Sequence, residues 1–180
     1  MFIKHELQNI ISGNGKVRHG EVIQTTLNYP RRKKEAVSEL EKTKFSKNEE
    51  TEILKFYIDT RSFWCQQLDE SKYIGVGAEQ KIHEFSDSNF VIKINSSIFY
   101  AFWEDYLINL LIHNYFFPHL AYELLGFITI NNTVNAVVKQ PFVKATKTTN
   151  LIYVKEFLKE NGFLNKKNND YFSPRARYYT

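Results

Sequence analysis

The residues best suited to chemistry lie between Tyr73 and Glu104, and they are of the types that can hold a triphosphate. Gly75 and Gly77 form a Gly-x-Gly turn between two short apolar stretches. Glycine lets the backbone approach phosphate oxygens closely and turn its N–H groups towards them. Lys93 follows in the alternating segment FVIKIN, where a strand lysine would supply a fixed positive charge. This order of residue types predicts a nucleotide-binding turn.

Taken alone, the glycine turn is a weak signal, because GVGAEQ lacks the third glycine of the usual phosphate-binding pattern. Lys93 is the stronger one, since apolar β-forming residues flank it on both sides. A lysine in the middle of a strand must reach solvent, an anion or a carboxylate. A surface lysine on an edge strand remains the alternative.

A carboxylate follows on the next predicted helix. Glu104 comes eleven residues after Lys93, in a segment that is apolar nearly all round. Leaving a buried carboxylate unpaired costs about several kcal/mol of stability. This cost favours a position in which the carboxylate pairs with a cation. We therefore predict that Glu104 pairs with Lys93. Asp105, about 100° away around the helix, is the alternative partner.

The periodicity of apolar residues predicts the elements that position these side chains. Strands are predicted over 73–77, 80–85 and 90–95, a buried helix over about 97–114, a hairpin over 121–143 around the turn NNT, and an amphipathic helix over 148–162. Ser46 and Glu49 fit a capping box, which predicts a further helix from there. The tail after that last helix has the pattern of a short hairpin. The chain is thus expected to be α+β.

Upstream of the predicted helix at Ser46, the chain alternates between apolar and charged stretches. EVIQTTLNY suits a strand or a short helix, whereas Pro30 to Asn48 is strongly charged and is expected to form an exposed linker. The basic cluster at Arg31–Lys34 could contact nucleic acid, but such clusters are more often only solvated. We therefore do not expect a nucleic-acid partner.

Composition narrows the class of protein. The chain has 180 residues, of which 43% are hydrophobic and 16% aromatic, with a formal net charge of +4. A single cysteine, Cys65, excludes a disulfide framework and a cysteine metal site. His83 and His113 lack partners at metal-ligand spacing, so no metal ligand is assigned and both histidines are predicted to be structural or exposed. Whether the protein uses a metal stays open. With no signal peptide or transmembrane stretch, a cytoplasmic location without membrane contact is expected.

Several longer segments carry a resemblance. YIGVGAEQKIHEF, FVIKIN, LLIHNYFFPHLAYELLGF and AVVKQPFVKAT together resemble the kinase-like domain of polyvalent proteins from bacterial mobile elements and phages, over roughly residues 20–172. The resemblance implies a protein-kinase-like N-lobe, with an antiparallel sheet of about five strands and a buried helix. It places ATP at Gly75, Gly77 and Lys93, with Glu104 holding the lysine. The backbone of Gln140 to Phe142 would meet the adenine edge.

The departure from the family pattern matters as much. The sequence contains no His-x-Asp and no Asp-Phe-Gly segment, which in kinases supply the catalytic base and a metal ligand. No catalytic residue is therefore assigned. We expect a kinase-like protein that is truncated before the catalytic loop, inactive alone and able to bind nucleotide weakly. Three origins of such a chain remain open: a degenerate kinase remnant, a natural short form, or a longer protein cut before the C-lobe.

The expected division of the chain is an N-terminal extension over 1–70 and a kinase-like N-lobe with connector helix and tail over 71–180. The surface that would face a C-lobe is expected to be apolar near Phe142, Phe157, Leu158 and Phe163, and a second copy or a partner chain would cover it. Two alternatives stay open. One is an interaction module with no nucleotide role, and the other is weak nucleic-acid association near Arg31.

Overall fold

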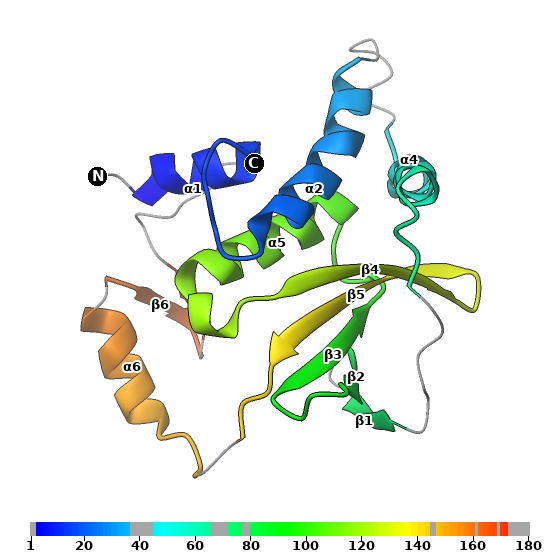
Figure 1. The fold of residues 1–180 in the computed structure, drawn as a ribbon. Helices are drawn as coiled ribbons and strands as arrows, with labels where there is room; N and C mark the ends of the chain where they lie inside the picture. Colours follow the sequence, from blue (N-terminus) through cyan, green and yellow to red (C-terminus); the bar gives the residue numbers. More distant parts are fainter. Residues whose placement is uncertain are drawn as a thin grey trace.

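A five-stranded antiparallel sheet with helices packed against one face forms the centre of the protein (Figure 1). The computed structural model describes residues 3–36, 45–65, 72–76, 80–144, 147–160, 162–168 and 170–172. The helices are α1 (Ile3–Ser12), α2 (Gly20–Glu35), α4 (Lys47–Thr60), α5 (Trp103–Phe116) and α6 (Leu151–Glu160), with a 3-10 turn, η2, at Pro118–Leu120. The strands are β1 (Tyr73–Val76), β2 (Lys81–Glu84), β3 (Phe90–Asn95), β4 (Glu123–Ile130), β5 (Thr133–Pro141), β6 (Leu164–Lys167) and β7 (Asp170–Phe172). The predicted α+β class is confirmed.

The sheet has the strand order β1-β2-β3-β5-β4, and each neighbouring pair is antiparallel. Asn131 and Asn132 connect β4 to β5 with φ angles of 48° and 61°. Two successive left-handed residues make the tight turn that matches the twist of a hairpin, and asparagine tolerates this conformation. The hairpin predicted around NNT is therefore confirmed.

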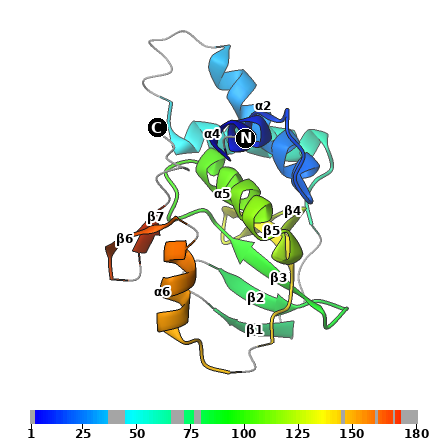
Figure 2. The ribbon, with the colours of Figure 1, turned by 90° about the vertical axis from the view of Figure 1, so that its left-hand side faces the viewer.

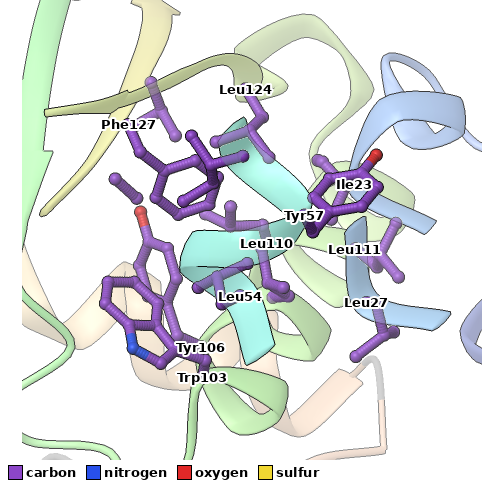
Figure 3. Close-up of a cluster of buried hydrophobic side chains, with 14 of the residues drawn as sticks. Ile23, Leu27, Leu54, Tyr57, Trp103, Tyr106, Leu110, Leu111, Leu124 and Phe127 are labelled. Atoms are coloured by element: carbon purple, nitrogen blue, oxygen red, sulfur yellow. The ribbon is translucent and has the colours of Figure 1, made fainter. Parts of the chain in front are cut away.

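The main core lies between this sheet and the helices α2, α4 and α5. Alternate residues of β5 point towards the helices, so Val134, Ala136 and Val138 are all buried there. Figure 3 shows the side chains that meet them: Ile23, Leu27, Leu54, Tyr57, Trp103, Tyr106, Leu110, Leu111, Leu124 and Phe127. The N-terminal helices thus share one core with the sheet. The predicted boundary at residue 70 stays a prediction.

Helix α2 corrects the prediction of a linker beginning at Pro30. The helix continues through Pro30 to Glu35, and Pro30 is buried. A proline removes one backbone N–H from a helix. Here the packing of Ile23 and Leu27 in the core holds the helix together in spite of that loss. At the other end of the predicted linker, Lys47 and Asn48 belong to α4. Residues 37–44 lie outside the described residues.

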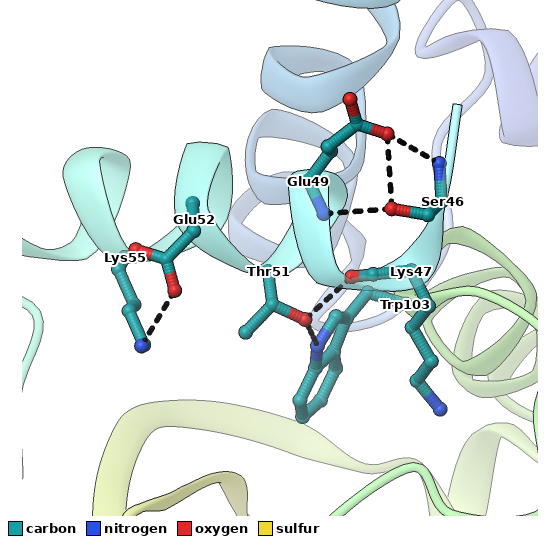
Figure 4. A network of polar contacts seen from close by, with 7 residues as sticks. All are labelled: Ser46, Lys47, Glu49, Thr51, Glu52, Lys55 and Trp103. Carbon is teal, nitrogen blue, oxygen red and sulfur yellow. Dashed lines mark hydrogen bonds and ion pairs between the residues drawn. The ribbon is translucent and has the colours of Figure 1, made fainter. Parts of the chain in front are cut away.

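The buried helix α5 begins at Trp103, six positions later than predicted. Ser97 has a φ of 54°, and the following residues form turns before Phe102 enters the helix in an extended conformation. The apolar pattern continues through the turns, which is why it suggested an earlier start. By contrast, the capping box of α4 is confirmed: Ser46 Oγ accepts from the Glu49 N–H, and the Glu49 carboxylate accepts from the Ser46 N–H (Figure 4).

The segment after β5 lies apart from the sheet. Helix α6 and the two-stranded β6–β7 hairpin follow the connector after Pro141, and Figure 2 shows them beside the body of the molecule. The hairpin predicted for the tail is confirmed. Within the described part of the chain, no helix has the length and apolar character needed to cross a membrane.

Candidate nucleotide-binding face

Lys93 projects from the face of the sheet that α5 covers. In the antiparallel register it lies opposite Ile82 on β2 and Val138 on β5, and cross-strand neighbours share a face. Val138 is buried in the main core, whereas Ile82 and Lys93 are only partly buried. Lys93 therefore lies at the edge of the core, where the face opens from the packed helices towards β2.

The Lys93 ammonium makes its contacts with an aromatic side chain. Its Nζ lies 3.5 Å from the Tyr122 hydroxyl and 5.4 Å from the centre of the Tyr122 ring. Among the described residues, no carboxylate forms an ion pair with it. Burial lowers the pKa of Lys93 below its usual range, because the charged form is partly desolvated. The site holds a positive charge that lacks a described counter-charge.

The predicted Lys93–Glu104 pair is wrong. Glu104 instead pairs with Arg31 of α2, with its Oε1 2.8 Å from Arg31 Nη2. Arg31 also donates to the Ile11 carbonyl at 2.9 Å, so its guanidinium joins α1, α2 and α5. The physical reason is the late start of α5, which puts Glu104 in the first turn, next to α2.

The carboxylate of Glu50 fixes this first turn of α5. Its two oxygens accept from the backbone N–H groups of Trp103 and Glu104, and the side chain is only 2% exposed. Such N–H groups have no partner inside the helix, and a negative charge there is favoured. Burial nevertheless raises the pKa of Glu50, while the two amide bonds oppose that shift. Glu50 thereby anchors α5 to α4.

Near Lys93, helix α5 contributes a histidine rather than an acid. His113 Nε2 lies 3.1 Å from the Leu120 carbonyl, and its ring centre lies 4.5 Å from that of Tyr122. Desolvation lowers the pKa of His113, and the nearby Lys93 charge lowers it further. Gln140 also donates to the Leu120 carbonyl, at 2.8 Å. Its side chain is therefore bonded within the protein, and the earlier assignment concerned only its backbone.

Sequence reasoning did not assign His113 or Tyr122 to this site. The sequence predicts only that His113 is structural or exposed, and it does not single out Tyr122. Their contacts join three segments distant in sequence, namely β3, the end of α5 and the approach to β4. Because these residues are far apart in the sequence, no local sequence pattern predicts that they lie together.

Gly75 lies on β1 opposite Ile82, next to an irregularity in the strand pairing. A Cβ added to Gly75 would meet nothing within 4 Å, and its φ is not in the left-handed region. The described protein therefore does not itself require a glycine there. Gly77, the second predicted turn residue, lies outside the described residues.

In the connector after β5, some backbone N–H groups are already hydrogen-bonded and others have no described partner. The Phe142 N–H donates to the Asn89 carbonyl at 2.7 Å, so the protein itself uses this donor. The Val143 N–H has no hydrogen-bond partner among the described residues, and the Phe142 and Val143 side chains are exposed. If an adenine edge accepts from an N–H group of the connector, the donor without a described partner is that of Val143, one residue after the predicted Gln140–Phe142 stretch.

A comparison with models of protein families identifies the family of this chain. The model of the family described as a serine/threonine/tyrosine kinase found in polyvalent proteins matches residues 47–178. The chain belongs to this family. No curated protein and no solved structure matches it. The resemblance predicted from the sequence is confirmed, and the sheet with α5 is a kinase-like N-lobe.

The residues that the sequence analysis assigned to a nucleotide do not all lie together. The structure brings Lys93 and Gly75 to one half of the sheet, through β2, and leaves Glu104 near α2. The binding roles of Gly75, Gly77, Lys93, Gln140 and Phe142 stay predictions.

Proposed function

We propose that this kinase-related chain binds ATP weakly on the Lys93 face of its sheet. The observation that carries the proposal is the Lys93 ammonium itself, a partly buried charge with no ion-pair partner among the described residues. A desolvated cation without a counter-ion is costly in a folded protein. A phosphate group would supply both the missing charge and charge-assisted hydrogen bonds.

Three features on the half of the sheet that carries Lys93 support the proposal. The open space over Gly75 lets the β1 backbone approach a phosphate. Ile82 offers a partly exposed apolar surface beside Lys93, and the free backbone of Val143 could meet the edge of a base. Since one lobe holds the ligand from one side only, we expect a Kd of about micromolar to millimolar.

We propose further that the 180 residues do not transfer phosphate by themselves. Neither a His-x-Asp nor an Asp-Phe-Gly segment occurs in the sequence. Phosphoryl transfer needs a group that orients or deprotonates the acceptor and a set of metal ligands. Incubation with labelled ATP and generic protein acceptors should give no labelled product. Labelling that disappears in Lys93→Met would contradict this part of the proposal.

The binding proposal is tested by calorimetric titration of ATP and Mg²⁺ into three proteins. Wild type should bind, and Lys93→Met should bind about 10- to 100-fold more weakly, because a charge-assisted hydrogen bond contributes about 1.5–3 kcal/mol. Lys81→Met is the matched control: Lys81 lies on the adjacent strand, opposite Ile94 and therefore on the other face. Equal affinities for all three proteins, or no binding at millimolar ATP, would refute the proposal.

An interaction module is the second candidate, and helix α6 is the observation that favours it. Tyr153, Val154 and Phe157 are all exposed, although they share one side of the helix. The Phe142 and Leu151 side chains are exposed as well. We propose that a second copy of the chain or a partner protein covers this apolar helix.

The structure gives less support to nucleic-acid association. Arg31, the first residue of the basic cluster, uses its guanidinium for Glu104 and the Ile11 carbonyl. The Lys34 ammonium lies over the ring of Phe102. A single free cysteine fits the reducing cytoplasm, which we propose as the location. An origin in a mobile element is likewise a proposal that follows from the kind of proteins in the family.

A further inference from the structure

Asn114 lies fully buried near the C-terminal end of α5 and joins two distant segments. Its Nδ2 donates to the Arg18 carbonyl at 2.9 Å and to the Tyr122 carbonyl at 2.8 Å. Its Oδ1 accepts from the Tyr122 N–H at 2.7 Å. One side chain therefore holds both backbone groups of Tyr122, and this fixes the backbone of the tyrosine just before β4.

The side chain of Tyr122 carries this constraint to Lys93. The Tyr122 ring packs against the His113 ring, and its hydroxyl lies 3.5 Å from Lys93 Nζ. No described carboxylate pairs with Lys93, so the tyrosine is the contact that holds the ammonium at the face. A shift of the Tyr122 backbone would move the charge that the proposed nucleotide needs.

Arg18 brings the N-terminal extension into the same network. It lies in the loop between α1 and α2, next to His19, whose φ is 53°. The loop is tightly packed, since a Cβ on Gly20 would lie 2.3 Å from Val17 Cγ1. This loop precedes residue 47, where the match to the kinase family begins. The family description therefore does not cover the contact.

We propose that Asn114 is a positioning residue that couples the α1–α2 loop to ATP binding at Lys93. The proposal rests on the proposed function. Asn114 does not touch the ligand; it sets the position of Tyr122, and Tyr122 sets the position of the ammonium. Because coupling between two sites is reciprocal, bound ATP should also stabilise the loop around Arg18.

The test compares Asn114→Ser with Asn109→Ser, a matched control on the exposed side of the same helix. ATP and adenosine are titrated separately, because only ATP carries phosphates for Lys93. In Asn114→Ser the preference for ATP over adenosine should fall by about 3- to 30-fold, the range expected for coupling through a network. A purely structural role would lower the amount of folded protein and leave this preference unchanged, and that result would overturn the proposal.

A spectroscopic readout separates this proposal from the proposed function. In wild type, the Lys93 ε-methylene resonance should be displaced by the ring current of Tyr122 and should move towards its free value in Asn114→Ser and in Tyr122→Leu. This measurement needs no nucleotide. If wild type binds no ATP, the proposed function fails, and an unchanged resonance in Asn114→Ser would show that the positioning role fails as well.

Two further measurements cover the case in which Asn114→Ser does not fold. Asn114→Asp keeps the acceptor for the Tyr122 N–H and loses both donors, so its Lys93 resonance should also move. In wild type, ATP should slow amide hydrogen exchange in the 17–20 loop. An unmoved resonance in Asn114→Asp, or unchanged loop exchange in a protein that binds ATP, would overturn the proposal.

Discussion

Glu50 and Lys93 are both charged side chains held against the apolar interior, and their surroundings differ. Glu50 lies between α4 and α5, where two backbone N–H groups satisfy its carboxylate. Lys93 lies on β3 with a tyrosine as its neighbour and no described carboxylate as partner. A buried charge that the protein satisfies serves the fold, whereas the charge without a described counter-charge is where we propose that a ligand binds.

Two glycines, Gly126 and Gly75, differ in the same way: the fold requires one of them and not the other. A Cβ on Gly126, in β4, would lie 2.5 Å from the Phe63 carbonyl oxygen, and its φ is 148°. A Cβ on Gly75 would meet nothing within 4 Å. The first glycine is required by close packing against the Phe63–Cys65 segment, and the second has no such neighbour.

The largest predicted effect comes from substituting these two glycines. Gly126→Ala should lower the free energy of unfolding by at least about 2 kcal/mol, because it adds both a clash and backbone strain. Gly75→Ala should change it by less than about 0.5 kcal/mol while weakening ATP binding. Urea unfolding measures both variants. If the Gly126→Ala and Gly75→Ala proteins were equally stable, packing would not require a glycine at position 126, and the contrast between the two glycines would be wrong.

The second prediction concerns Glu50→Gln. Glutamine keeps one acceptor for the N-terminal amides of α5 but turns an NH₂ group towards the other amide. The free energy of unfolding should fall by about 1–3 kcal/mol. Glu52→Gln is the control, since Glu52 is exposed and its ion pair among the described residues is with Lys55 on the surface. Equal losses in the two variants would show that Glu50 does not anchor α5.

The third prediction has the opposite sign. Lys93→Met should raise the free energy of unfolding by about 1 kcal/mol at neutral pH, because it removes a charge that the fold holds at a cost to stability. Burial lowers the folded-state pKa of Lys93, so the cost is present below that pKa and vanishes as pH rises above the unfolded value of about 10.4. The gain of the variant should therefore shrink towards pH 10. A loss of stability at neutral pH would mean that Lys93 is already well paired.

The smallest predicted effect is on self-association through α6. Phe157 is 63% exposed on the apolar side of that helix. Sedimentation at high protein concentration should show weak dimers, and Phe157→Glu should abolish them without changing the melting temperature. Glu156→Gln, on the charged side, is the control. A clean monomer for wild type would leave the apolar helix without a role in self-association.

Much of the fold follows from local patterns in the sequence. The capping box at Ser46, the alternation of β3 and the Asn131–Asn132 turn each act within a few residues, so they could be predicted. The partners of the charges could not. Arg31 and Glu104 are 73 positions apart and Glu50 acts on amides more than 50 positions away, so only the packing of α2, α4 and α5 brings them together.

The candidate site shows the same limit. The lysine and the glycine turn could be found from residue types, because their chemistry is tied to a strand and a turn. The choice between Glu104 and Asp105 as the partner of Lys93 failed because both alternatives assumed a helix starting near residue 97. Once α5 starts at Trp103, the side chains near Lys93 come from the end of that helix and from Tyr122.

The central proposal is that ATP binds on the Lys93 face and not in a cavity elsewhere in the protein. A cavity of about 300 Å³ between α4 and the β4–β5 turn, lined by Lys47, Thr51 and Lys55 among others, is the competing place. Titration of isotope-labelled protein with ATP, followed by amide NMR shifts, distinguishes the two directly. We predict that the shifts concentrate at Gly75, in the 91–93 segment and at Val143. Shifts confined to the residues around Lys47 and Lys55, with Lys93 unmoved, would contradict the account.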